Sequence, residues 1–137
     1  MDRLSPKDRS ENMRRIRSRD MRPEMTVRRT VHAMGYRYRL HDNRLPGKPD
    51  LVFRSRSKII FVHGCFWHQH PDKRCPIVRT PKSNTVYWNQ KLRQNVARDR
   101  KTKRRLRELG WSVLTVWECQ TRDVDKLTKR LRIFLER

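Results

Sequence analysis

The chain has 137 residues, enough for one compact domain and too few for two ordinary ones, so we expect a single functional site. Its 36 lysines and arginines against 14 acidic residues give a formal net charge of +22 at pH 7. Such an excess repels itself unless a polyanion lies close by, and nucleic acid is the commonest such partner. The charge alone leaves open a ribosomal or chromatin-type protein that catalyses no reaction.

The composition also excludes several classes of protein. No segment approaches the roughly 20 apolar residues of a membrane span, and the N-terminus lacks the apolar region of a signal peptide, so we expect a cytoplasmic protein without membrane contact. Apolar runs over residues 59–62 and 111–117 argue against disorder. The odd number of cysteines, three, argues against a disulfide framework and favours metal ligands or free thiols.

The N-terminal part of the chain divides into an arm and a helix. Residues 1–20 are polar and basic and read as an arm outside the core, whereas residues 21–137 read as one domain. A helix is predicted from Asp20 to Gly35, because Asp20 can cap it, Pro23 fits its first turn and apolar residues recur at helical spacing.

Three short strands are predicted next. Apolar and polar residues alternate over residues 36–41, the period of a half-buried strand. A turn with two prolines over residues 45–49 separates it from a strand over residues 51–53. The third strand, residues 58–63, is apolar enough to lie centrally in a sheet.

The second half of the chain begins with a long loop. Residues 64–84 show no periodicity, and a loop of this length in a compact domain is usually functional or held by a metal. We expect a long basic helix over residues 84–109, a strand over 111–117 and a closing helix over 123–135. The residues of the long helix expected to face the core are Trp88, Leu92, Val96, Leu106 and Leu109. A strand after a crossover helix can pair in parallel with an earlier one, so the fold class is mixed α/β.

Cysteine and histidine residues cluster in the long loop. Cys65, His70 and Cys75 have spacings close to those of zinc ligands, and Cys119 could supply a fourth ligand from another part of the fold. A structural zinc with these ligands would tie the loop to the sheet. The alternative is that Cys119 is simply buried and the other residues are unligated.

Asp50 is the best placed of the few acidic residues. It follows Pro49 at the start of a predicted strand, where a carboxylate can hold Mg²⁺ beside a phosphodiester. The arrangement resembles the Pro-Asp motif of restriction-endonuclease-like nucleases, although Phe61 and His63 occupy the positions of their second acidic residue and lysine. A turn-capping role explains Asp50 equally well.

Several motifs together resemble the very short patch repair (Vsr) mismatch endonucleases. They lie in the same order along nearly the whole chain: Asn12-Met13-Arg14, Leu45-Pro46-Gly47-Lys48-Pro49-Asp50, Phe61-Val62-His63-Gly64-Cys65-Phe66-Trp67-His68, Asn95-Val96-Ala97-Arg98-Asp99, Glu108-Leu109-Gly110-Trp111 and Trp117-Glu118-Cys119. The resemblance implies a restriction-endonuclease-like mixed β-sheet flanked by helices, with a structural zinc site. It also implies strand-specific nicking of duplex DNA 5′ to the thymine of a T·G mismatch that arises from 5-methylcytosine deamination.

The resemblance implies a magnesium site and a general base. Asp50 and the backbone carbonyl of Val62 would bind Mg²⁺, and Glu24 would complete the site through metal-bound water. His68 would activate water as the general base, held and polarised by Asp99. A further histidine, His63, would contact the scissile phosphate or assist the leaving group.

The family pattern also assigns DNA-intercalating residues. Phe66, Trp67 and Trp88 would insert from the major groove and Met13, on a DNA-clamping arm of residues 1–20, from the minor groove. Core packing is the alternative for these aromatic residues. One departure from the pattern concerns zinc, because the interval from His70 to Cys75 is longer than in the best-known members, which makes Cys75 the least secure ligand.

The implied cofactors are catalytic Mg²⁺ and structural Zn²⁺, and the implied partner is duplex DNA with a T·G mismatch. Other mismatch-repair proteins are further partner candidates, and we expect a monomer associated with the bacterial nucleoid. Two other functions stay open. One is a non-catalytic zinc-containing DNA-binding module, and the other is a restriction or junction nuclease of the same fold.

Overall fold

A mixed four-stranded sheet, ordered β1-β2-β3-β4, lies at the centre of the part of the chain that the computed structural model describes, residues 21–137. Its strands are β1 (Arg39–Leu40), β2 (Leu51–Phe53), β3 (Lys58–His63) and β4 (Ser112–Trp117). The first three run antiparallel to one another, and β4 pairs in parallel with β3. The predicted mixed α/β fold and the central place of β3 are confirmed. The proposed arm and Met13 lie outside the described residues.

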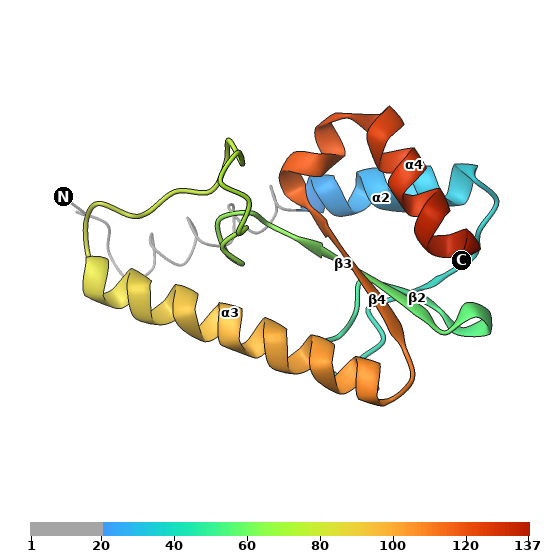
Figure 1. Cartoon of the computed structure of the whole chain (residues 1–137), viewed down its shortest axis with the longest axis horizontal. Coiled ribbons are helices and arrows are strands. Elements are labelled where there is room, and N and C mark those ends of the chain that lie inside the picture. The colour runs from blue at the N-terminus through green and yellow to red at the C-terminus, as the bar shows by residue number, and fades with distance from the viewer. Residues whose placement is uncertain (1–20) are drawn as a thin grey trace.

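Helices cover both faces of this sheet (Figure 1). Helices α2 (Met21–Ala33) and α4 (Val124–Glu136) pack on one face, and α3 (Thr85–Glu108) lies on the other. Alternate strand residues therefore enter two cores. The first contains Val27, Val31, Leu51, Phe53, Ile60, Val116, Leu127, Leu131, Phe134 and Leu135. The second contains Val52, Ile59, Phe61 and Leu106. No helix in residues 21–137 is long and apolar enough to cross a membrane.

Two details of the predicted elements are wrong. The strand predicted over residues 36–41 forms only at residues 39–40, because Tyr36 and Tyr38 bind α2 instead. The Tyr36 N–H donates to the Val31 carbonyl at 3.3 Å, and the Tyr38 hydroxyl donates to the Arg28 carbonyl at 3.3 Å. Both tyrosine side chains pack beside the first core.

Helix α3 has fewer core residues than its sequence predicted. Leu92 and Leu106 are buried, but Trp88 and Val96 are only partly buried and Leu109 is 59% exposed. The reason is geometric. Figure 1 shows the first half of α3 extending past the sheet, so that only its C-terminal part lies against the strands.

The carboxyl ends of the two parallel strands meet at one edge of the sheet. His63, the last residue of β3, is paired with Trp117, the last residue of β4. The long loop of residues 64–84 and the 3₁₀ helix η2 (Glu118–Arg122) both start at this edge. Ligand sites of α/β sheets commonly lie at such carboxyl ends.

Candidate active site

The predicted site residues gather at this edge, on both faces of the sheet. Successive residues of a strand point to opposite faces. Val62 packs beside the core beneath α2 and α4, whereas His63 lines a cavity beside α3. Two polar clusters therefore flank the end of β3, one on each face.

The first cluster is acidic and combines Glu24 from α2 with Asp50, the residue before β2. The Val62 N–H donates to Asp50 Oδ2 at 2.7 Å, which fixes this carboxylate against the end of β3. His41 lies between the two acids, with its Nε2 atom 2.7 Å from Glu24 Oε1 and 3.8 Å from Asp50 Oδ1. These three side chains place their ligand atoms within 4.8 Å of one another, so they could hold a metal ion.

The environment shifts the pKa values of the two acids in opposite directions. Burial and the neighbouring Glu24 together raise the pKa of Asp50 to about 7, against the opposing effects of the Val62 N–H and the charge of His41. Burial also acts to raise the pKa of Glu24, but hydrogen bonds with His41 and Asp50 and the charges of His41 and Arg28 bring it below its ordinary value. Two carboxyl groups held this close are the oxygen donors that a divalent cation prefers, and a cation would offset their repulsion.

His41 is a site residue that the sequence reasoning missed. It has a left-handed backbone (φ 47°), and its N–H donates to the Asp50 carbonyl at 3.2 Å, directly beyond the last β1–β2 pair. The register of the predicted hairpin is the sequence signal that could have identified His41. Strands joined by the turn of residues 45–49 bring position 41 opposite position 50.

The second cluster joins the long loop to α3. His68 Nδ1 lies 2.6 Å from Asp99 Oδ2, so the pair proposed from sequence is brought together. Burial acts to raise the pKa of Asp99, but the hydrogen bond and charge of His68 keep it below its ordinary value, so Asp99 is ionised. With Nδ1 engaged by Asp99, Nε2 is the His68 atom left to face a substrate.

His63 supports His68 from beneath. Their rings are stacked, with centroids 3.8 Å apart and an angle of 9° between the planes. His63 is 5% exposed, and burial together with the nearby charge of His68 lowers its pKa to about 3. His63 is therefore neutral near pH 7, and the geometry favours a packing or hydrogen-bonding role over a cationic one.

Buried Asn95 on α3 fixes the loop that carries His68. Its Nδ2 donates to the Trp67 carbonyl at 3.0 Å, and the His68 N–H closes a turn onto the Gly64 carbonyl at 3.1 Å. The position of the His68 ring is thus set by both backbone and side-chain hydrogen bonds.

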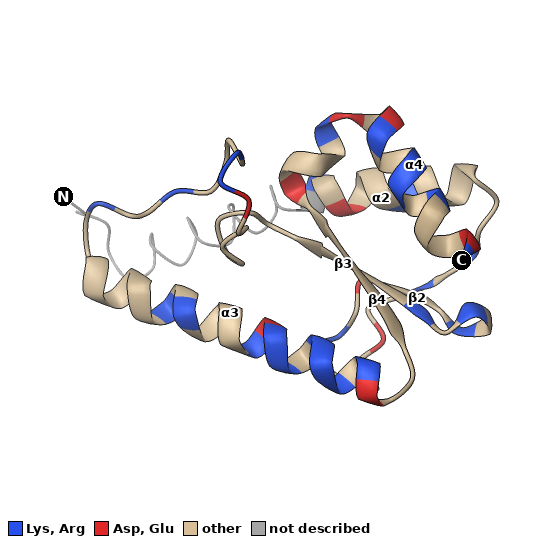
Figure 2. Ribbon diagram, in the orientation of Figure 1, with Lys and Arg blue, Asp and Glu red and all other residues tan. Residues whose placement is uncertain are grey.

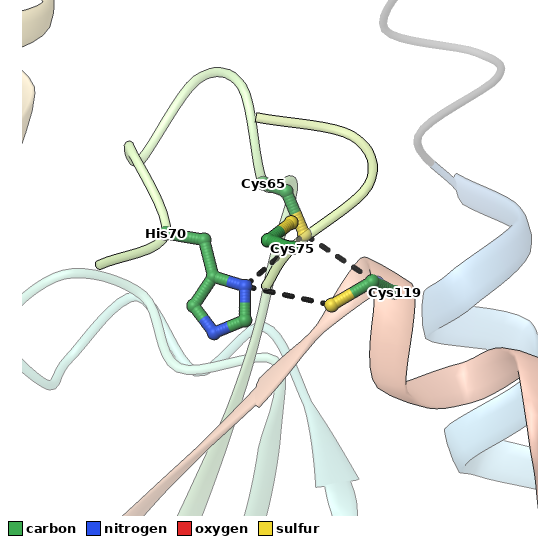
Figure 3. Close-up of side chains that lie close together, drawn as sticks. All are labelled: Cys65, His70, Cys75 and Cys119. Carbon is green, nitrogen blue, oxygen red and sulfur yellow. Dashed lines mark hydrogen bonds between the residues drawn. The ribbon is translucent and has the colours of Figure 1, made fainter. Parts of the chain in front are cut away.

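A third cluster contains all three cysteines of the chain together with His70 (Figure 3). His70 Nδ1 lies 3.4 Å from Cys119 Sγ and 3.7 Å from Cys65 Sγ. Cys75 joins the same group in spite of its longer interval from His70, and the four ligand atoms lie within 4.8 Å of one another. None of the three cysteines forms a disulfide.

The sheet register explains why distant cysteines meet here. Cys65 and Cys119 each follow the paired residues His63 and Trp117 by two positions, so the parallel strands deliver both to one point. The Cys119 N–H donates to Cys65 Sγ at 3.4 Å. The His70 ring is stacked on Trp117 with centroids 4.3 Å apart. These ligands, three thiols and one imidazole, have the number and type that a structural metal site requires.

The aromatic residues predicted to intercalate form one group beside the start of α3. The ring centroids of Phe66, Trp67 and Trp88 are 5.2 to 5.8 Å apart, and all three side chains are only partly buried. None belongs to either core. Tyr87, which the sequence reasoning did not include, lies edge-on to Trp88 at 5.3 Å and is 54% exposed.

Comparison with known proteins places the chain among nucleases. Residues 1–74 match the family model described as DNA mismatch endonuclease Vsr. The type II nicking enzyme V.XorIIP of Xanthomonas oryzae pv. oryzae is 47% identical over 135 residues, which cover 98% of this chain and 97% of that protein. The DNA mismatch endonuclease Vsr of Escherichia coli (strain K12) is 44% identical over 120 residues, covering 88% and 75%. The type II nicking enzyme V.NmeAIP of Neisseria meningitidis is 39% identical over 119 residues, covering 87% and 83%. Together with the matched motifs at the edge of the sheet, these similarities show that the chain belongs to the DNA mismatch endonuclease Vsr family.

Proposed function

We propose that this protein is a Mg²⁺-dependent endonuclease of restriction-endonuclease-like fold that nicks duplex DNA 5′ to the thymine of a T·G mismatch. Such a mismatch arises from 5-methylcytosine deamination, and the nick would start very short patch repair. The observation that carries the proposal is the meeting of the His68–Asp99 pair and the Glu24–Asp50 pair at one end of β3. Family membership supports the same reaction class.

His68 is the proposed general base. Its free Nε2 takes the proton of the attacking water, while Asp99 holds the opposite side of the ring at 2.6 Å and stabilises the imidazolium that forms. The stacked His63 ring prevents His68 from tilting away. His63 also lies close enough to line the same cavity, where we propose that it faces the scissile phosphate.

Asp50, the backbone carbonyl of Val62 and Glu24, the last through water, would hold Mg²⁺. The bound ion would supply Lewis-acid stabilisation of charge on the phosphodiester oxygens. The chain's own contribution is to fix the donors. Val62 N–H orients Asp50, and Arg28 at 2.7 Å holds the second oxygen of Glu24.

Cys65, His70, Cys75 and Cys119 would hold a structural Zn²⁺. These ligands bracket His68 in sequence, so a metal there would fix the loop of residues 64–84 to the end of β4. The proposed zinc therefore acts on catalysis only by holding His68 within reach of Asp99.

DNA binding is proposed to use α3 and the aromatic group. Figure 2 shows Lys and Arg along much of α3, where their charges can contact phosphates. Phe66, Trp67 and Trp88 would enter the base stack from the major groove, with Met13 of the proposed arm on the minor-groove side. A weakly stacked T·G pair lowers the cost of this insertion. A monomer with one catalytic site would cut only one of the two DNA strands.

A panel of labelled duplexes tests the proposal against its alternatives. The substrates are a T·G duplex with randomised flanks, the matched T·A and C·G duplexes and a four-way junction. We expect nicking only at T·G and only in the thymine strand. Cleavage of matched or branched DNA at a similar rate would favour a restriction or junction nuclease. Tight binding of T·G DNA without any nicking would favour a non-catalytic module.

A further inference from the structure

A cavity of about 340 Å³ lies beside the His68–Asp99 pair. The turn of residues 45–49, the end of β3 and one face of α3 form its walls. Three of its lining side chains are basic: Lys48, Arg98 and Lys103. Asp99 is the one carboxylate in the lining, and its charge is already engaged by His68. The cavity therefore has an excess of positive charge.

Two of the basic residues come from α3. Arg98 and Lys103 line the cavity together with Asp99 and Thr102 of the same helix. Arg98 is oriented by Asn95, whose Oδ1 accepts a hydrogen bond from its guanidinium at 3.2 Å. Lys103 is half-buried beneath the end of β4, with Nζ 5.9 Å from the centre of the Trp117 ring.

None of these three cations has an ion-pair partner among residues 21–137. Acidic side chains elsewhere in the described residues do pair with basic ones, as Glu24 does with Arg28 and Asp42 with Arg44. Burial lowers the pKa of Lys103 against the opposing effect of the Asp99 charge, which reflects the cost of holding an ammonium group partly away from water. An anion bound in the cavity would remove that cost.

The third cation is placed by a strained turn. Gly47 has φ +75°, and a Cβ atom there would collide with Thr102 Cγ2, so the turn lies directly against α3. Lys48 also has a left-handed backbone (φ 46°), which is unfavourable for a residue with a side chain. Strained residues persist where their surroundings fix them, and they concentrate at ligand sites. The strained turn brings Lys48, two positions before Asp50, to the cavity.

We propose that Lys48, Arg98 and Lys103 form a phosphate-binding pocket for the cut DNA strand. It holds the backbone phosphate next to the scissile one. This inference rests on the proposed function and adds to it the residues that align the strand with His68. Many other basic residues of α3 supply general attraction to DNA, so the pocket acts on the rate of nicking more than on affinity.

Charge-removing variants test the pocket. Lys48→Gln and Lys103→Gln each remove one pocket cation, and the matched control Lys101→Gln removes an exposed lysine of α3 outside the cavity. With saturating protein, we expect the pocket variants to nick a T·G duplex about tenfold or more slowly, because a charged hydrogen bond is lost. Their dissociation constants should change no more than that of Lys101→Gln. Equal rates for all three variants would overturn the proposal, and exposed Lys48 provides the test if Lys103→Gln fails to fold.

A scan of neutral phosphates identifies the phosphate that is held. A single methylphosphonate is placed at each position around the nick. At the phosphate held by the pocket, the methylphosphonate should slow nicking by the wild type but should not slow nicking by Lys103→Gln any further. At every other position the effects of the methylphosphonate and of Lys103→Gln on the nicking rate should add. Additive effects at every position would overturn the proposal. If the wild type does not nick T·G DNA at all, the proposed function fails and the pocket proposal fails with it, whereas nicking with additive effects at every position overturns the pocket alone.

Discussion

Replacement of Asp99 by Asn tests the proposed general base most selectively. The variant keeps the size of the side chain but removes the negative charge that lies 2.6 Å from His68 Nδ1. The two side chains are 17% and 24% exposed, so water screens their interaction only weakly. A hydrogen bond to a charged group contributes about 1.5–3 kcal/mol. If that stabilisation is needed when His68 accepts a proton, the nicking rate falls about 10- to 150-fold, at about 1.4 kcal/mol for each factor of ten.

The assay is single-turnover nicking of a T·G duplex at saturating protein, so that binding does not limit the rate. The matched control is Asp125→Asn, which neutralises an exposed carboxylate in the first turn of α4. We expect the control to cut at the wild-type rate. Circular dichroism establishes that Asp99→Asn remains folded. A folded Asp99→Asn protein that nicks within twofold of the wild-type rate would refute a catalytic role for the pair.

Three further predictions concern the metals and stability. Purified protein should contain about one zinc per chain by elemental analysis. The Cys119→Ser variant should lose both the zinc and the nicking activity. Metal-free protein with full nicking activity would contradict this prediction. His41→Ala should raise the Mg²⁺ concentration needed for half-maximal nicking about tenfold and weaken Mg²⁺ binding in calorimetry, because Glu24 loses its 2.7 Å partner. His41→Gln keeps a hydrogen-bond donor and should be closer to wild type. Equal losses in both variants would reject this role for His41. Hydrogen bonds from Arg44 and Arg54 hold the pKa of Asp42 far below its usual value, so the stability that they provide is present above about pH 4 and is lost as the pH falls further. Urea unfolding should therefore show a weaker acid dependence below about pH 4 for Asp42→Asn, and an unchanged dependence would show that Asp42 is not responsible.

Side chains whose positions follow from strand periodicity were predictable from sequence. The paired ends of β3 and β4 bring Cys65 to Cys119, and a parallel pairing after a long helix was already indicated by the order of the elements. The partnership of His68 with Asp99 came from the family pattern, and the structure brings the two residues into contact.

The residues that sequence reasoning missed depend on backbone conformations and distant contacts. His41 and Lys48 both have positive φ values, which no periodic pattern reveals. Lys48 lines its cavity beside Gly47, which lies against Thr102, a contact between a turn and a distant helix. The strand predicted at residues 36–41 is shorter in the structure for a similar reason, since the tyrosines at its start bind α2.

The most direct test of the central claim compares wild-type protein with Asp50→Ala on an end-labelled T·G duplex in the presence of Mg²⁺. The account predicts a single nick 5′ to the mismatched thymine by the wild type, none in the guanine strand, and no detectable nick by a folded Asp50→Ala protein that still binds the duplex. Nicking by Asp50→Ala at the wild-type rate, or equal cutting of both strands, would contradict it.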